Sequence, residues 1–306
     1  MDLKVWVRVL HETLFLFALA SSGVVAQTQC PSTGVAVQVL GSGGPLARTG
    51  RASSSYVLWV DGRSRLMVDA GGGSFLRFGE SGAQLADLDL LALSHFHPDH
   101  VSDLPAILWG DRLRQEPLHI VGPSGNEAVP ALDLFLSRLF DPEDGAFQIL
   151  SGTLGGPGRG APFNPVMVDV DRAGPMVILQ EAGLTVRALP VPHANIPSLA
   201  YRVETQGVSV VFSGDQTGRD PAFVSFSRGA SALVMHLAVS PAASGAMLNV
   251  HATPEVVGQV AADSDVEQLI LSHLFVGDVA GGVAEVRTRY DGVVRIAEDL
   301  TCYPVG

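Results

Sequence analysis

The segment His95-Phe96-His97-Pro98-Asp99-His100 places three histidines and an aspartate within one short stretch, directly after the apolar run 88–93. A His-x-His pair in an extended segment puts two imidazoles on the same side, and the following turn directs Asp99 and His100 toward a neighbouring position. Histidine and carboxylate ligands with open coordination positions are typical of catalytic metal sites. A solvated polar loop is the alternative, but the apolar residues on both sides favour a site holding two adjacent metal ions.

Four further histidines lie at or beside the ends of predicted strands: His193, His236, His251 and His273. Asp69 also ends a predicted strand, and we expect it to accept hydrogen bonds from the segment 95–100 rather than to bind metal. His119 and His11 fit no such position.

Strand-like and helix-like stretches follow one another in two similar halves. In the first half, strands are predicted at 35–40, 55–60, 65–69 and 88–93, and helices at 104–108 and 132–140. In the second half, strands are predicted at 184–189, 199–204, 208–213, 232–238 and 268–272, a helix after Thr253, and a helix and a strand within 282–298. This order favours two sheets packed face to face with helices outside. The Gly- and Pro-rich residues 151–165 are predicted to be a long loop, able to close over a small substrate.

The first 26 residues are predicted to be a cleavable export signal, because Lys4 and Arg8 precede an apolar run that ends in small residues. A buried N-terminal helix is the alternative. Residues 27–306 then form a single domain, periplasmic or secreted, without a stretch long enough to span a membrane. In an exported protein Cys30 and Cys302 are expected to form a disulfide, with two unrelated thiols as the alternative.

The charge of the chain limits the classes of partner that it can bind. The chain has a formal net charge of −12 and a single lysine, Lys4, which excludes phosphate-loop and Schiff-base lysine chemistry. An acidic chain without lysine clusters also binds polyanions poorly, so nucleic acid is a disfavoured partner.

The residues 95–100, preceded by 68–73 and followed by Gly214-Asp215 and Ser272-His273, resemble the metallo-β-lactamase superfamily. The resemblance implies an α/β fold, a four-layer αβ/βα sandwich. The segments 41–45, 211–215 and 251–254 are similar to the branch that holds ribonuclease Z, phosphodiesterases and zinc-dependent arylsulfatases. The segments 51–54 and 73–80 are most similar to exported arylsulfatase-type members.

The resemblance also implies two divalent metal ions, expected to be zinc, with a metal-bound hydroxide as nucleophile. The implied ligands are His95, His97 and His193 for one ion, Asp99, His100 and His273 for the second, and Asp215 bridging both. Asp99 would also orient the hydroxide. An aspartate rather than a cysteine at the bridging position favours sulfate or phosphate esters over lactams.

Two more histidines have positions in the same resemblance. His251 would face the substrate and assist the leaving group. His236 is followed by Leu237 where glutamate is usual, which weakens a proton relay and leaves core packing as its alternative.

We therefore predict an exported dinuclear hydrolase of small anionic esters, of arylsulfatase or phosphodiesterase type. Ribonuclease Z carries a long tRNA-binding arm where this chain has only a predicted hairpin, between His193 and Asp215. The alternatives are a ribonuclease Z-like endoribonuclease, a lactonase or β-lactamase-type hydrolase, and a metal-binding protein that kept the fold without turnover.

Overall fold

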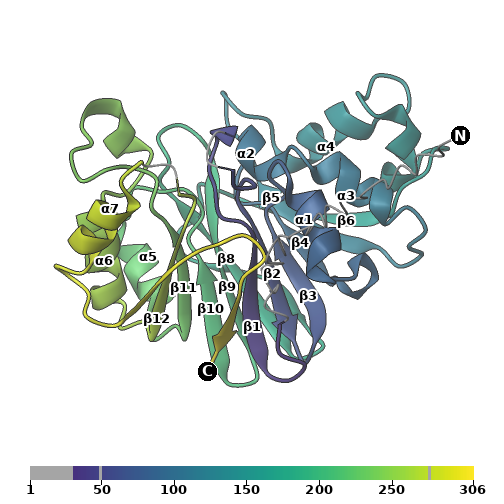
Figure 1. Ribbon diagram of the computed structural model, residues 1–306. Helices are drawn as coiled ribbons and strands as arrows, with labels where there is room; N and C mark the ends of the chain where they lie inside the picture. The colour runs from purple at the N-terminus through teal and green to yellow at the C-terminus, as the bar shows by residue number, and fades with distance from the viewer. Residues whose placement is uncertain (1–29, 48–49, 275–276) are drawn as a thin grey trace, which may run out of the picture.

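Two seven-stranded sheets pack face to face in the computed structural model, which describes residues 30–47, 50–274 and 277–306 (Figure 1). The predicted export signal, residues 1–26, and His11 lie outside the described residues. Helices cover the outer face of each sheet, so the predicted four-layer α/β sandwich is confirmed.

The first sheet runs in the order β14-β1-β2-β3-β4-β5-β6. Its strands are β1 (Val35–Gly41), β2 (Ser55–Val60), β3 (Arg63–Val68), β4 (Leu90–Ala92), β5 (Leu118–Pro123), β6 (Phe163–Val168) and β14 (Cys302–Val305). Its helices are α1 (Ser74–Ser81), α2 (Pro98–Val101), α3 (Leu104–Gly110) and α4 (Leu132–Phe140), with 3₁₀ turns η2 (Leu85–Asp87) and η3 (Gln148–Leu154).

The second sheet runs in the order β13-β12-β11-β10-β9-β8-β7. Its strands are β7 (Met176–Glu181), β8 (Leu184–Val191), β9 (Ser198–Thr205), β10 (Val208–Phe212), β11 (Ala232–His236), β12 (Gln268–Ser272) and β13 (Val293–Ile296). Its helices are α5 (Pro221–Ser227), α6 (Pro254–Asp263) and α7 (Val279–Val286), with the 3₁₀ turn η4 (Gly245–Asn249).

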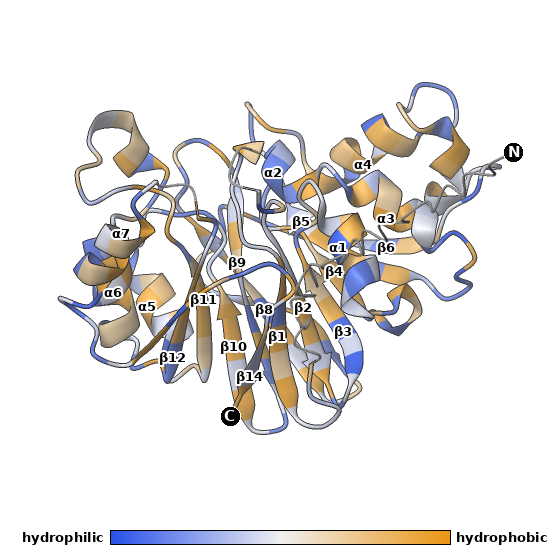
Figure 2. Ribbon diagram, in the orientation of Figure 1, coloured by the Kyte–Doolittle hydropathy of each residue, from blue (hydrophilic) through white to orange (hydrophobic). Residues whose placement is uncertain are grey.

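The apolar core is divided into three layers by the sheets. Inward-facing side chains of both sheets, such as Leu58, Leu66 and Tyr201, form the central layer. Helices α3 and α4 cover the first sheet and α6 covers the second. In Figure 2 many strand residues have the orange colour of hydrophobic residues. β4 is buried along its length, as expected of a parallel strand covered on both faces.

The first and last described segments of the chain meet at the first sheet. β14 pairs antiparallel with β1, which places Cys302 opposite Gln38. Cys302 forms the predicted disulfide with Cys30, and their Cα atoms are 5.3 Å apart. No helix among the described residues is long and apolar enough to cross a bilayer.

The residues predicted as a single long loop, 151–165, are more ordered than expected. They contain the end of η3 and the start of β6, and Ser151 and Thr153 are buried. The backbone N–H of Arg159 donates to Ile149 O at 2.7 Å, which folds the glycine-rich stretch back on η3. η3 itself packs against α3 and α4. The loop is therefore part of the helical layer.

Candidate metal centre

The carboxyl ends of four strands, two from each sheet, meet at one edge of the sandwich. β3 is followed by Asp69, β4 by the segment 95–100, β10 by Asp215 and β12 by His273. At these positions a strand ends and a loop begins, so the side chains can face a common space rather than the apolar core.

All seven predicted metal ligands come together at this edge. Potential ligand atoms of the described residues lie within 4.8 Å of one another in overlapping groups: His95, His97 and His193; His95, His100 and Asp215; Asp99, His100 and His273; and His193, Asp215 and His251. Asp215 shares groups with histidines of both predicted sites, which is the placement a bridging carboxylate requires. The role of these side chains as ligands remains a prediction.

The first predicted site consists of three imidazoles. His95 Nε2 lies 2.9 Å from His97 Nδ1, and His193 Nε2 lies 3.5 Å from the same atom. His193 Nδ1 donates to the backbone carbonyl of Val250 at 2.7 Å, which leaves its Nε2 lone pair facing the site. Burial lowers the pKa of all three histidines, so the neutral, metal-binding form is favoured.

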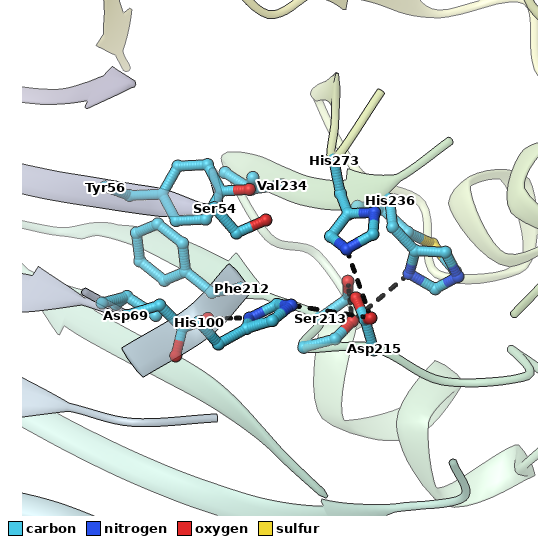
Figure 3. Close-up of a pocket in the computed structure, with 13 residues that line it drawn as sticks. Ser54, Tyr56, Asp69, His100, Phe212, Ser213, Asp215, Val234, His236 and His273 are labelled. Carbon is cyan, nitrogen blue, oxygen red and sulfur yellow. Dashed lines mark hydrogen bonds and ion pairs between the residues drawn. The ribbon is translucent and has the colours of Figure 1, made fainter. Parts of the chain in front are cut away.

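The second predicted site combines two carboxylates with two imidazoles. His273 Nε2 lies 3.2 Å from Asp99 Oδ2 and 3.4 Å from Asp215 Oδ2. His100 Nε2 lies 3.7 Å and 3.6 Å from the same two oxygens. Figure 3 shows His100 and His273 directed at Asp215. Burial opposes ionisation of Asp215, but His273 and His100 outweigh it and hold the pKa of the carboxyl well below its usual range.

The donor set fits divalent metal ions. His100 Nε2 and His251 Nδ1 are buried without a hydrogen-bond partner among the described residues, although both belong to the candidate ligand groups. Buried polar atoms without partners are rare, and a cation is one way to satisfy them. Imidazole nitrogens with carboxylate oxygens are the ligands that zinc accepts in catalytic sites.

Asp69 occupies its predicted place beneath the site. Its carboxylate accepts from Ser94 N at 2.7 Å, from Ser94 Oγ at 2.8 Å and from His100 Nδ1 at 2.8 Å. The prediction that Asp69 holds the segment 95–100 is confirmed. Ser94 was missed, because a serine before a histidine carries no distinguishing signal in a sequence.

His251 and His236 lie side by side with different partners. His251 Nδ1 is 3.9 Å from Asp215 Oδ2, and burial lowers the pKa of His251 to about 3. His236 Nδ1 donates to Gly214 O at 3.3 Å, and its Nε2 accepts from Ala252 N at 3.1 Å. His236 therefore holds the backbone next to His251, which agrees with a packing role rather than a proton relay.

Two spaces border the centre. A cavity of about 20 Å³ lies between the sheets, lined by residues such as Tyr56, Phe212 and His100, and is too small for a substrate (Figure 3). An open cleft of about 370 Å³ lies beside His193 and is also lined by Arg172. The cleft has the size of a small-molecule site. Residues 151–165 line neither of these two spaces, and closure of this loop over a substrate stays a prediction.

Fold and side-chain arrangement together are those of a superfamily of metal-dependent hydrolases, with the candidate centre at the strand ends. The family comparison agrees, because residues 64–274 match the family described as beta-lactamase superfamily domain. The chain belongs to this metallo-β-lactamase superfamily, as its sequence predicts.

The chain is also similar to curated proteins and to solved structures. Ribonuclease Z of Mycolicibacterium paratuberculosis is 29% identical over 285 residues, which cover 87% of this chain and 96% of that protein. The metallo-β-lactamase fold protein YhfI from Bacillus subtilis has a TM-score of 0.69 at 22% identity, covering 88% of this chain and 99% of that one. Human tRNase Z, short form, has a TM-score of 0.68 at 20% identity, covering 89% and 99%. The two structural likenesses show the shared fold.

Proposed function

We propose that this protein is a dinuclear metal hydrolase of small anionic esters, either sulfate or phosphate esters. The observation that carries the proposal is the position of Asp215, whose Oδ2 lies 3.4 Å from His273 and 3.9 Å from His251, in groups that also include His95 and His193. A hard carboxylate between two ligand clusters suits two ions acting on one charged oxygen-rich group.

The protein's own residues set the geometry of the proposed reaction. His95, His97 and His193 would hold one ion, and Asp99, His100 and His273 the other, with Asp215 shared. When bound, such ions supply an activated water near neutral pH and offset the negative charge of the ester. Asp99 would orient that water. Because its low pKa keeps His251 neutral, its ring N–H would donate to the leaving-group oxygen; the side chain is 11% exposed.

A small substrate is favoured over tRNA by the residues between His193 and Asp215. This interval consists of a short turn, β9 and β10, paired from Tyr201 with Phe212 to Thr205 with Val208. No residues remain there for a tRNA-binding arm. The net charge of −12 opposes polyanion binding as well.

Endoribonuclease activity is the second candidate, because the curated relative named ribonuclease Z aligns along most of this chain. The test is a comparison of kcat/KM for an aryl sulfate, an aryl phosphodiester, an aryl lactone and a precursor tRNA with zinc-reconstituted protein. We expect one of the two anionic esters to exceed the lactone and the tRNA by at least tenfold. Preference for the lactone would contradict the ester assignment, and efficient tRNA cleavage would establish the second candidate. No turnover with two bound ions would favour the non-enzymatic alternative.

The role proposed for His251 is tested with leaving groups of different basicity. His251→Ala should reduce turnover of an ester with a poor leaving group by about 10² or more, and that of an ester with a good leaving group far less. His119→Ala, which alters a histidine on β5 in the other sheet, is the matched control. Equal losses for both esters would contradict a proton-donating role.

We further propose that the chain is exported and that residues 1–26 are removed. The apolar run after Lys4 and Arg8 supports a signal, and the Cys30–Cys302 disulfide is typical of oxidising compartments. Amino-terminal sequencing of protein recovered from the periplasm or medium should read from Gln27. Recovery of intact chain from the cytoplasm alone would contradict export.

A further inference from the structure

His273 differs from other histidines of the centre in how its ring is held. His100 Nδ1 donates to Asp69 and His193 Nδ1 donates to Val250 O, which fixes each ring through its outer nitrogen. The Nδ1 atom of His273 has no hydrogen-bond partner among the described residues. Its backbone also has φ of 49°, a left-handed conformation that is costly for a residue with a side chain. Its Nε2 lies within hydrogen-bond distance of Asp99 Oδ2, at 3.2 Å, but no hydrogen bond holds the ring from the Nδ1 side, so packing must support it there.

The backbone of Gly44 supports the His273 ring. A Cβ atom at position 44 would lie 2.7 Å from His273 Cε1 and 3.0 Å from Nδ1, closer than van der Waals contact permits. The next residue is held by the same segment, because Leu274 N donates to Ser42 O at 2.8 Å and Leu274 forms a bridge with Gly43. Residues 42–44 therefore support both the ring and the backbone of the ligand.

One carboxylate anchors this segment. Asp299 Oδ1 accepts from Ser42 N at 3.0 Å and from Ser42 Oγ at 2.7 Å. Asp299 Oδ2 accepts from Ala52 N at 2.8 Å, and Ala52 O accepts from Gly43 N at 2.8 Å. The Asp299 side chain is 12% exposed and also pairs with Arg77 at 3.4 Å. Asp299 therefore holds Ser42 directly and Gly43 through Ala52.

We propose that Asp299 is a positioning residue for the His273 half of the metal centre, acting through residues 42–44. The proposal rests on the dinuclear centre proposed above. It connects the segment just before β14 to a ligand that follows β12, although Asp299 touches neither the ligand nor the substrate.

The first test is metal binding by Asp299→Ala at buffered free zinc, with bound metal counted after equilibrium dialysis. We expect one ion per chain to bind as in the wild type, while the second needs about 10- to 100-fold more free zinc, the usual effect of removing a residue that orients a ligand. Asp299→Asn keeps one acceptor oxygen and should recover part of the affinity. Asp111→Ala is the matched control, because Asp111 is 9% exposed and ion-paired with Arg114 at the end of α3.

A zinc-binding curve of Asp299→Ala that coincides with that of Asp111→Ala would overturn the proposal. Equally weakened binding of both ions would overturn it as well.

The second test needs no metal, so it separates this inference from the proposed function. In protein labelled with ¹⁵N at histidine and stripped of metal, Asp299→Ala and Gly44→Ala should both shift or broaden the His273 ring signals and leave those of His193 in place. Asp111→Ala should change neither. Unchanged His273 signals in both variants would overturn the positioning role. A wild-type protein that binds fewer than two ions, but shows the His273 response, would refute the dinuclear centre and leave the positioning of His273 intact.

Discussion

Asp215 places a buried carboxylate beside two histidines of the candidate centre. It is the buried carboxylate that lies 3.6 Å from His100 Nε2 and 3.4 Å from His273 Nε2. We expect Asp215→Ala to lose cooperative binding of two ions and to reduce kcat by at least about 10³, since a shared ligand and its charge disappear together. Metal counting after zinc reconstitution, together with turnover of the preferred ester, checks this. Retention of two tightly bound ions would contradict a bridging role.

His236 makes the metal-free protein sensitive to acid. Burial lowers its pKa to about 4, whereas in the unfolded chain it takes up a proton near pH 6.5. The unfolded state therefore binds more protons between these values, and the free energy of unfolding falls as pH decreases from 6.5 to 4, by about 3 kcal/mol for this residue.

The variant His236→Gln removes this titration and keeps an acceptor for Ala252 N. We expect its free energy of unfolding to depend less on pH than that of the wild type over the same window. Urea unfolding of chelator-treated protein at pH 8, 6.5 and 5 measures this. The difference between the two proteins at pH 8 gives the pH-independent cost of the substitution. Parallel pH curves would show that His236 does not titrate as described.

Between elements, Asp69 connects the end of β3 to the end of β4. It accepts three hydrogen bonds, two from Ser94 and one from His100, and its own backbone is left-handed with φ of 59°. Asparagine tolerates that conformation, so Asp69→Asn tests the carboxylate with little backbone strain. We expect metal affinity to fall about 10- to 100-fold. The control is Asp89→Asn, at a partly buried ion pair with Arg65. Equal zinc affinity in both variants would contradict the role of Asp69.

The elements predicted with the right bounds have a regular apolar pattern. β2 and α4 have the predicted bounds, because their apolar residues match the periods of a strand and a helix. β5, β14, α1 and α5 were not predicted, and neither were β6 and β7. β6 and β7 are edge strands with three exposed residues of six each, and β6 contains Pro165, so neither shows the alternation of a buried strand.

The residues of the candidate site also fall into a group that was predicted and a group that was not. The resemblance to the metallo-β-lactamase superfamily implied the seven residues that come together, and the segment 95–100 carried most of that resemblance. Ser94, Gly44 and Asp299 were not predicted as parts of the site, because their contacts depend on which backbone segments become neighbours. Asp299 and Ser42 are far apart in the chain and meet only in the folded protein.

At the scale of the whole molecule, the Cys30–Cys302 disulfide closes a loop that contains nearly every described residue. Loop-closure entropy in the unfolded chain gives it up to about 5 kcal/mol of stabilisation. We expect the double variant Cys30→Ser, Cys302→Ser to unfold at lower denaturant concentration and to keep its activity at moderate temperature. Unfolding of wild-type protein with and without reductant is the parallel measurement. Identical midpoints would show that the bridge adds nothing to stability.

The pairing of β14 with β1 determines when the first sheet can be completed during synthesis. β1 precedes every other described strand in the chain, but the strand that covers its outer edge consists of residues 302–305. Until residues 302–305 have been made, β1 therefore exposes unpaired backbone groups, the kind of edge that recruits other chains. A chain cut short before residue 302 would keep this edge of the first sheet open.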